Sequence, residues 1–150
     1  LLKYMEDHHC RYDVLAHPHS HSSSASAHAA RVPEDCMAKP VILEDDRGYL
    51  MAVVPANRQV DLQMLQRATG RTLRLAPEYA FGRLFRDCEL GAMPPVGSAY
   101  GMPMMIDESL RGMREVYFEA GDHEELIQMD AEQFCAMMDS AGFASFCATH

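Results

Sequence analysis

Several features that would define a special class of protein are missing from this sequence. No stretch approaches the roughly 20 consecutive apolar residues that a membrane-spanning helix needs, and the N-terminal LLKYMEDHHC lacks the apolar core of a signal peptide. The 5 cysteines are an odd number, are widely spaced and form no CxxC pair, so reduced thiols are the simplest interpretation. We therefore expect a soluble, cytoplasmic protein with no membrane partner.

An overall excess of positive charge is also missing. The chain has 13 Lys and Arg against 22 Asp and Glu, a net charge of −9 with neutral histidine, which argues against DNA binding and against broad RNA binding through a basic face. The charge is nevertheless segregated, because residues 58–86 contain six arginines and two acids, hence +4. This segment, which includes Arg71 and Arg74, could form a local anion site, or it could be a solvated face paired with acidic side chains.

What the chain does contain is the material for one compact domain over residues 1–150. It is 48% hydrophobic and 23% charged, which is ordinary for a globular domain. Strand-like runs lie at residues 11–16, 39–43, 49–55, 72–75, 102–106, 115–119 and 125–129. Helix-like segments lie before Pro33 and at residues 60–68, 77–85 and 131–140. No strict βαβ rhythm is present, so we expect an α/β fold of the α+β type, with a mixed, mostly antiparallel sheet or a barrel-like core surrounded by helices.

Three local patterns are well defined. Residues 39–43 and 49–55 are apolar runs separated by a charged turn, which predicts a hairpin. The helix-like spacing after Val60 begins beside Asp61 and ends before Gly70, the usual asymmetry of helix ends. Residues 87–100 contain two Gly and two Pro and are expected to form a long structured loop.

Three segments carry a family resemblance: AKPVILEDDRGYLMAVVPANRQVDLQML, FRDCELGAMPPVGSAYGMPMMIDESL and EVYFEAGDHEELIQM. In this order they resemble the YbaK/prolyl-tRNA synthetase-associated editing domain family, over a recognisable core of residues 12–138. The resemblance implies a small α/β domain that hydrolyses mischarged aminoacyl-tRNA, typically a wrong amino acid on tRNA for proline. The length is similar to that of a free-standing member, which would act in trans on the acceptor end, alone or with a synthetase. The basic segment would then dock the tRNA through Arg71 and Arg74.

The resemblance also assigns roles to particular residues. Lys39 matches the family's strand lysine and residues 91–95 match its GxxxP loop, so the implied catalytic residues are Lys39, Gly91 and Pro95. The implied substrate-binding residues are His21, Ser22, Ala92, Met93, Gly101, Gly121, Asp122 and His123. Two departures lie by the expected pocket. His21 and Ser22 stand where many relatives have an aromatic residue and Thr, and Pro40 follows the lysine where Thr or Ala is common. The identity of the amino acid that is removed is therefore left open.

Hydrolysis of an activated ester needs neither a covalent nucleophile nor a cofactor. A deacylase must mainly position the ester, stabilise an oxyanion and place a water. Gly91 allows close approach of the backbone to a ligand, while Pro94 and Pro95 fix φ and remove donors, so that the remaining N–H groups can point to one place. The Lys39 ammonium could hold a phosphate or a carbonyl oxygen. Without the resemblance, the loop is better explained as a rigid turn and the lysine as a solvated edge-strand side chain.

Other function classes stay open at this point. His17, His19 and His21 could bind Zn²⁺ if their stretch is extended, but no partner ligand stands at a suitable spacing, so we expect a solvated loop and no metal. Cys36 and Cys88 have no recognisable neighbouring base and are better explained as small buried hydrophobes. The alternatives to a deacylase are a non-catalytic module that binds an aminoacyl end, an amino acid or a protein partner, and a His-rich metal-binding protein.

Overall fold

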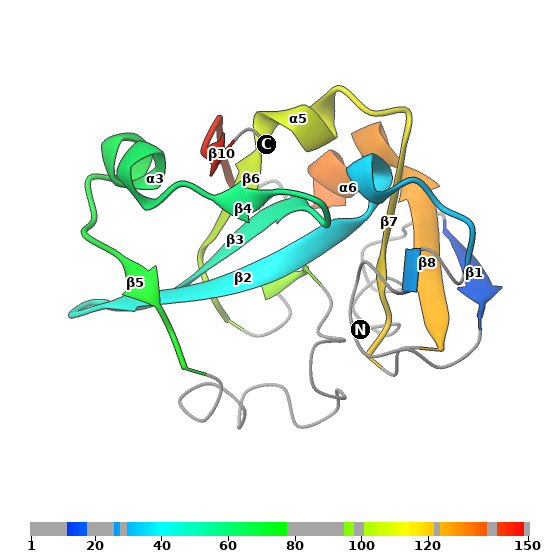
Figure 1. The fold of residues 1–150 in the computed structure, drawn as a ribbon, viewed down its shortest axis with the longest axis horizontal. Coiled ribbons are helices and arrows are strands. Elements are labelled where there is room, and N and C mark those ends of the chain that lie inside the picture. The colour runs from blue at the N-terminus through cyan, green and yellow to red at the C-terminus, as the bar shows by residue number, and fades with distance from the viewer. Residues whose placement is uncertain are drawn as a thin grey trace.

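The computed structural model describes residues 12–17, 26–27, 30–77, 95–97, 101–121, 124–137 and 141–148. Strands of these residues form three sheets, with the orders β5-β2-β3-β6-β9, β1-β8-β7 and β10-β4 (Figure 1). Most pairings are antiparallel, so the predicted mixed α+β fold is confirmed. In the described part of the chain the sheets are open, and the barrel-like alternative is not formed.

The five-stranded sheet contains the predicted hairpin at its centre. Its strands are β2 (Ala38–Asp45), β3 (Gly48–Pro55), β5 (Arg74–Leu75), β6 (Met104–Asp107) and β9 (Gly142–Ala144). β2 and β3 pair antiparallel along their full lengths. β6 runs parallel to β3, and β9 runs parallel to β6, which makes this sheet mixed.

The two smaller sheets are antiparallel. The three-stranded sheet is built from β1 (Asp13–Ala16), β7 (Glu115–Glu119) and β8 (Glu125–Asp130), as the sequence predicts. The two-stranded sheet joins β4 (Gln59–Val60) to β10 (Cys147–Ala148), two short strands that the sequence analysis does not predict. The chain after residue 138 therefore adds β9 and β10 to the fold.

The described helices are η1 (Glu34–Cys36), α3 (Leu62–Thr69), α5 (Glu108–Arg111) and α6 (Ala131–Met137). α3 begins and ends where predicted, because the Asp61 carboxylate accepts hydrogen bonds from the N–H groups of Gln63 and Met64, and Gly70 is left-handed with φ 71°. None of the described helices is long and apolar enough to cross a membrane. Part of the helix predicted before Pro33 is described: Ser26 and Ala27 are helical, and the Ala30 N–H donates a hydrogen bond of 2.9 Å to the Ser26 carbonyl. Residues 78–85 of the next predicted helix, and most of the loop at 87–100, lie outside the described residues.

Strand β3 divides the core into two clusters. Alternate residues of a strand point to opposite faces of its sheet. Met51 and Val53 therefore pack toward the three-stranded sheet and α6, whereas Ala52 and Val54 pack toward α3 and the C-terminal Phe146. From Leu50 onward β3 is buried on both faces, which explains its continuous apolar sequence.

Candidate functional site

Lys39 lies near the start of β2, directly opposite Val54. Its Nζ donates a hydrogen bond of 3.1 Å to the main-chain carbonyl of Ala56, and its side chain is half-buried. Burial lowers the pKa of the ammonium, against smaller opposing effects from Cys147 and Glu34. Among the described residues no carboxylate lies within ion-pair distance of this ammonium. An anionic ligand would therefore stabilise a charge that is partly removed from water.

The Ala56 carbonyl, which accepts the hydrogen bond from Lys39, belongs to a well-anchored turn. The Arg58 N–H donates a hydrogen bond of 3.0 Å to the Pro55 carbonyl, which closes the turn. The Asn57 side-chain amide donates one of 2.6 Å to the Asp35 carboxylate, which ties the turn to η1. Arg58 is half-buried and stands two residues after Ala56.

The C-terminal segment covers the same side of the sheet. Phe146 is fully buried and packs in the core cluster that contains Val54, the residue opposite Lys39. The Phe146 carbonyl accepts a hydrogen bond of 2.7 Å from the Asp61 N–H. Cys147 then pairs with Val60 of β4. Residues that follow the predicted core at 12–138 therefore help to build the surroundings of the lysine.

The Cys147 thiol lies among charged groups. Burial, together with the neighbouring Asp107 carboxylate, raises the pKa of Cys147 to about 12, although Arg58 and Lys39 act in the opposite direction. A thiol with this pKa is protonated at neutral pH and is a poor nucleophile. Cys147 therefore does not act as a nucleophile itself.

Asp107 anchors the C-terminal segment to α5. Its side chain is buried, and its carboxylate accepts hydrogen bonds from the N–H and hydroxyl of Ser109 and, at 3.0 Å, from the Phe146 N–H. Burial alone would raise the pKa of Asp107, but these hydrogen bonds outweigh burial and lower it. The sequence analysis missed this residue. Asp107 followed by Glu108 is a helix-start pattern that could have predicted α5.

The far end of the predicted GxxxP loop is packed into the core. Pro95 is buried, and Val96 belongs to the core cluster that contains Ala38, the neighbour of Lys39. Gly91, Ala92 and Met93 lie outside the described residues. The expectation that the loop's N–H groups point at the substrate therefore stays a prediction.

The two predicted glycines within the described residues both adopt positive φ. Gly101 is exposed with φ 70°, and Gly121 is buried after β7 with φ 116°. Such conformations favour glycine over any residue with a Cβ. Four more predicted substrate-binding residues, His21, Ser22, Asp122 and His123, lie outside the described residues. That these residues approach Lys39 stays a prediction.

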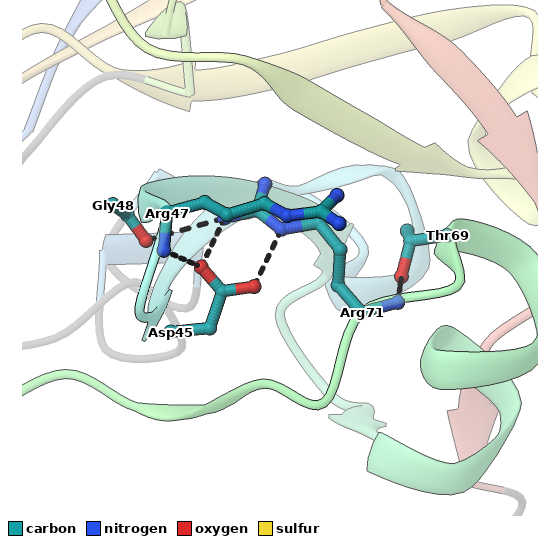
Figure 2. A network of polar contacts seen from close by, with 5 residues as sticks. All are labelled: Asp45, Arg47, Gly48, Thr69 and Arg71. Carbon is teal, nitrogen blue, oxygen red and sulfur yellow. Dashed lines mark hydrogen bonds and ion pairs between the residues drawn. The ribbon is translucent and has the colours of Figure 1, made fainter.

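Arg71 lies at the opposite end of the β2–β3 hairpin from Lys39. Its Nε and Nη2 donate hydrogen bonds of 2.8 and 2.7 Å to the two carboxylate oxygens of Asp45, and Nη2 also lies 3.3 Å from the Gly48 carbonyl (Figure 2). The hydrogen bonds from Arg71 hold the pKa of Asp45 well below its usual range, and the same contact raises the pKa of Arg71. Arg71 therefore ties the hairpin turn to the chain that follows α3.

Arg74 is far more accessible. Its side chain is 65% exposed, and its Nε lies 3.4 Å from the Glu44 carboxylate. An exposed pair of this length contributes little to stability. The tRNA-binding role expected for Arg71 and Arg74 stays a prediction, but Arg74 is the one whose guanidinium remains open to a phosphate.

The described residues offer little for the other chemistries. No group of three or more His, Cys, Asp and Glu among them could hold a metal ion. His17 is buried, while His19 and His21 lie outside the described residues. Burial and the nearby Asp35 and Glu115 carboxylates raise the pKa of Cys36, which disfavours the nucleophilic thiolate.

Solved structures share this fold at low sequence identity. A "putative trans-editing enzyme for prolyl tRNA synthetase" covers 98% of this chain and 94% of its own, with a TM-score of 0.83 and 22% identity. The hypothetical protein APE2540 covers 98% of both chains, with a TM-score of 0.87 and 18% identity. A "putative signal transduction protein" from Marinobacter aquaeolei VT8 covers 98% of this chain but only 30% of its own, with a TM-score of 0.81 and 22% identity. A search of curated proteins found no match.

Family membership comes from the sequence. The aminoacyl-tRNA editing domain matches residues 17–136, most of the chain. This range contains Lys39, the loop at residues 91–95 and Gly121, where the resemblance was found. The chain therefore belongs to the aminoacyl-tRNA editing domain family.

Proposed function

We propose that this protein is a trans-editing deacylase that hydrolyses the ester of mischarged aminoacyl-tRNA, with tRNA for proline as its substrate type. The observation that carries the proposal is the environment of Lys39. Its ammonium is half-buried on a strand of an aminoacyl-tRNA editing domain, and its hydrogen-bond partner is a main-chain carbonyl rather than a carboxylate. A cation in that state favours an anionic ligand such as the phosphate of a tRNA 3′ end.

In the proposed reaction, water attacks the ester carbonyl and no covalent intermediate forms on the protein. Lys39 holds a phosphate or ribose oxygen of the terminal nucleotide, and the loop at residues 91–95 orients the carbonyl through backbone N–H groups. A free hydroxyl of the terminal ribose can assist the water. The ester is already activated, so orientation and stabilisation of the oxyanion supply most of the rate enhancement.

The test is a deacylation assay over a panel of mischarged tRNAs, including tRNA for proline carrying several wrong amino acids. We expect release of at least one amino acid well above the spontaneous rate, with correctly charged prolyl-tRNA spared. A protein that binds the aminoacyl end but releases nothing across the panel would be the non-catalytic module instead. Metal analysis of the same purified protein separates both from a His-rich metal-binding protein.

The pH dependence of binding provides a second test. Burial lowers the pKa of Lys39, so the ammonium loses its proton below the ordinary lysine range of about pH 10.4. Affinity for an acceptor-end oligonucleotide should therefore fall as the pH rises through that lowered value. The Lys39→Arg variant, which stays protonated, should keep its affinity at the same pH. An identical fall in both proteins would remove Lys39 from the phosphate site.

A further inference from the structure

We infer that Arg58 is a second phosphate-binding residue, which forms a two-cation site with Lys39 for the backbone of the tRNA 3′ end. This inference rests on the proposed function and extends it, because it concerns the binding of the nucleotides rather than the amino acid. It is also distinct from the expectation for Arg71 and Arg74, which lie at the other end of the hairpin.

The first support is the geometry of the turn. Lys39 Nζ lies 3.1 Å from the Ala56 carbonyl, and Arg58 is two residues further in the turn that its own N–H closes on Pro55. The Cα atoms of residues 56 and 58 can be no more than roughly 7 Å apart along the chain. An arginine side chain at that position is long enough to reach the space beside the lysine ammonium.

The second support is the shared neighbour of the two cations. Cys147 pairs with Val60, two residues after Arg58, and both Arg58 and Lys39 act to lower the pKa of its thiol. They approach it from different elements, since Lys39 stands on β2 and Arg58 lies between β3 and β4. Two positive charges are thus brought to one side of the fold, where the C-terminal segment packs.

The third support is the absence of a neutralising acid within the described chain. No described carboxylate lies within ion-pair distance of either cation. Glu34 acts on Lys39 without pairing with it. The carboxylate of Asp107, the acid beside Cys147, already accepts hydrogen bonds from Ser109 and the Phe146 N–H. Two adjacent cations repel each other unless an anion joins them. Phosphate, which accepts hydrogen bonds from ammonium and guanidinium alike, has the chemistry to do so.

The site suits a nucleic-acid backbone better than a free carboxylate. In a chain of net charge −9, binding must come from a few local contacts rather than from a general field. Two cations can engage one or two adjacent phosphates of the single-stranded end. Because such contacts carry no base identity, they would position the substrate and leave discrimination to the pocket.

The experiment measures binding of a CCA trinucleotide to the intact protein, with fluorescence anisotropy at several salt concentrations. Arg58→Gln should weaken binding about tenfold or more, since a hydrogen bond to a charged group contributes about 1.5–3 kcal/mol and 1.4 kcal/mol is tenfold. It should also make the slope of log K against log salt shallower by about 0.7. Arg58→Lys should recover part of the affinity, because it restores the charge but not the paired hydrogen-bond donors of the planar guanidinium.

The matched control is Arg47→Gln, which removes one exposed arginine from the hairpin turn at the far end of β2 and β3. It should leave both the affinity and the salt slope at the values of the unmodified protein. Thermal midpoints of all variants separate lost binding from lost folding. If Arg58→Gln stays folded and binds the trinucleotide with unchanged affinity and slope, the two-cation site is wrong.

The outcomes also separate this inference from the proposed function. Trinucleotide binding that depends on both Arg58 and Lys39, in a protein that deacylates nothing, would support the two-cation site and contradict the proposed deacylase activity. Deacylation whose KM is unaffected by Arg58→Gln would support the proposed deacylase activity and contradict the two-cation site. If both hold, we expect the variant to raise KM for mischarged tRNA with a smaller effect on kcat, as for loss of binding shared by ground and transition states.

Discussion

The two ends of the β2–β3 hairpin both contain basic side chains, but they leave those charges in opposite states. At the turn, Arg71 forms a bidentate pair with Asp45 and is neutralised (Figure 2). At the other end, roughly 20 Å away at about 3.3 Å per residue, the Lys39 ammonium donates a hydrogen bond to a main-chain carbonyl and has no carboxylate partner among the described residues. Net charge along the sequence therefore does not reveal which cations are available to a ligand.

The largest effect should come from Lys39→Ala. Loss of the ammonium should lower deacylation by about 100-fold or more, equivalent to about 2.7 kcal/mol of transition-state stabilisation. The thermal midpoint should stay nearly unchanged, because the variant removes a partly desolvated charge and one hydrogen bond to a carbonyl. Single-turnover deacylation and a thermal scan check both expectations. Turnover at the rate of the unmodified protein would end the assignment of Lys39 to the site.

A smaller but clear effect is expected from Asp107→Ala. It leaves the buried Phe146 N–H without its acceptor and removes the cap of α5, so the free energy of unfolding should fall by about 2 kcal/mol. Urea unfolding measures the change. Ser109→Ala is the matched control, because it removes one hydroxyl partner and leaves the carboxylate, and it should lower stability by less. Equal stability of Asp107→Ala and the unmodified protein would show that the C-terminal segment is held by other contacts.

Much of the fold could be predicted because its elements have strong local signals. The hairpin at β2 and β3 has two apolar runs with a charged turn, and α3 has Asp61 and Gly70 at its ends. β9 and β10 could not be predicted in this way. They contain three and two residues, and their pairing partners β6 and β4 lie far away in the sequence, so tertiary contacts rather than local pattern define them.

The candidate site was harder to predict from the sequence than the fold. Lys39 came from the family resemblance, since a lysine at the start of an apolar strand is by itself better explained as a solvated side chain. Arg58 appeared only as one of six similar arginines in a basic segment. Arg71 has a carboxylate partner, whereas Arg58 has none among the described residues. That partner, Asp45, lies 26 residues from Arg71 in the sequence. Charge pairing at that separation is invisible without the fold.

The Asp45–Arg71 pair predicts a stability effect with a defined pH dependence. Arg71→Gln should lower the thermal midpoint by a few degrees at pH 7. The pKa of Asp45 is depressed in the folded protein, so the contribution of the pair is complete above the unfolded carboxyl pKa of about 3.9 and is lost as the pH falls through the lower folded value. The difference between the two proteins should therefore shrink below about pH 4. A constant difference from pH 7 to pH 2 would contradict the ion pair.

The smallest effect is expected from Arg74→Gln, which tests whether the exposed arginine near the turn contacts tRNA at all. Each phosphate contact contributes roughly −0.7 to −0.9 to the slope of log K against log salt. Loss of Arg74 should therefore make the slope for whole tRNA shallower by less than one, with no change in thermal midpoint, since its pair with Glu44 is 65% exposed on the arginine side. Binding of the CCA trinucleotide should not change, because the hairpin turn lies too far from Lys39 to touch three nucleotides held there. A tRNA slope equal to that of the unmodified protein would mean that Arg74 is solvated surface, and that the contacts of this acidic protein with tRNA are confined to the lysine end of the hairpin.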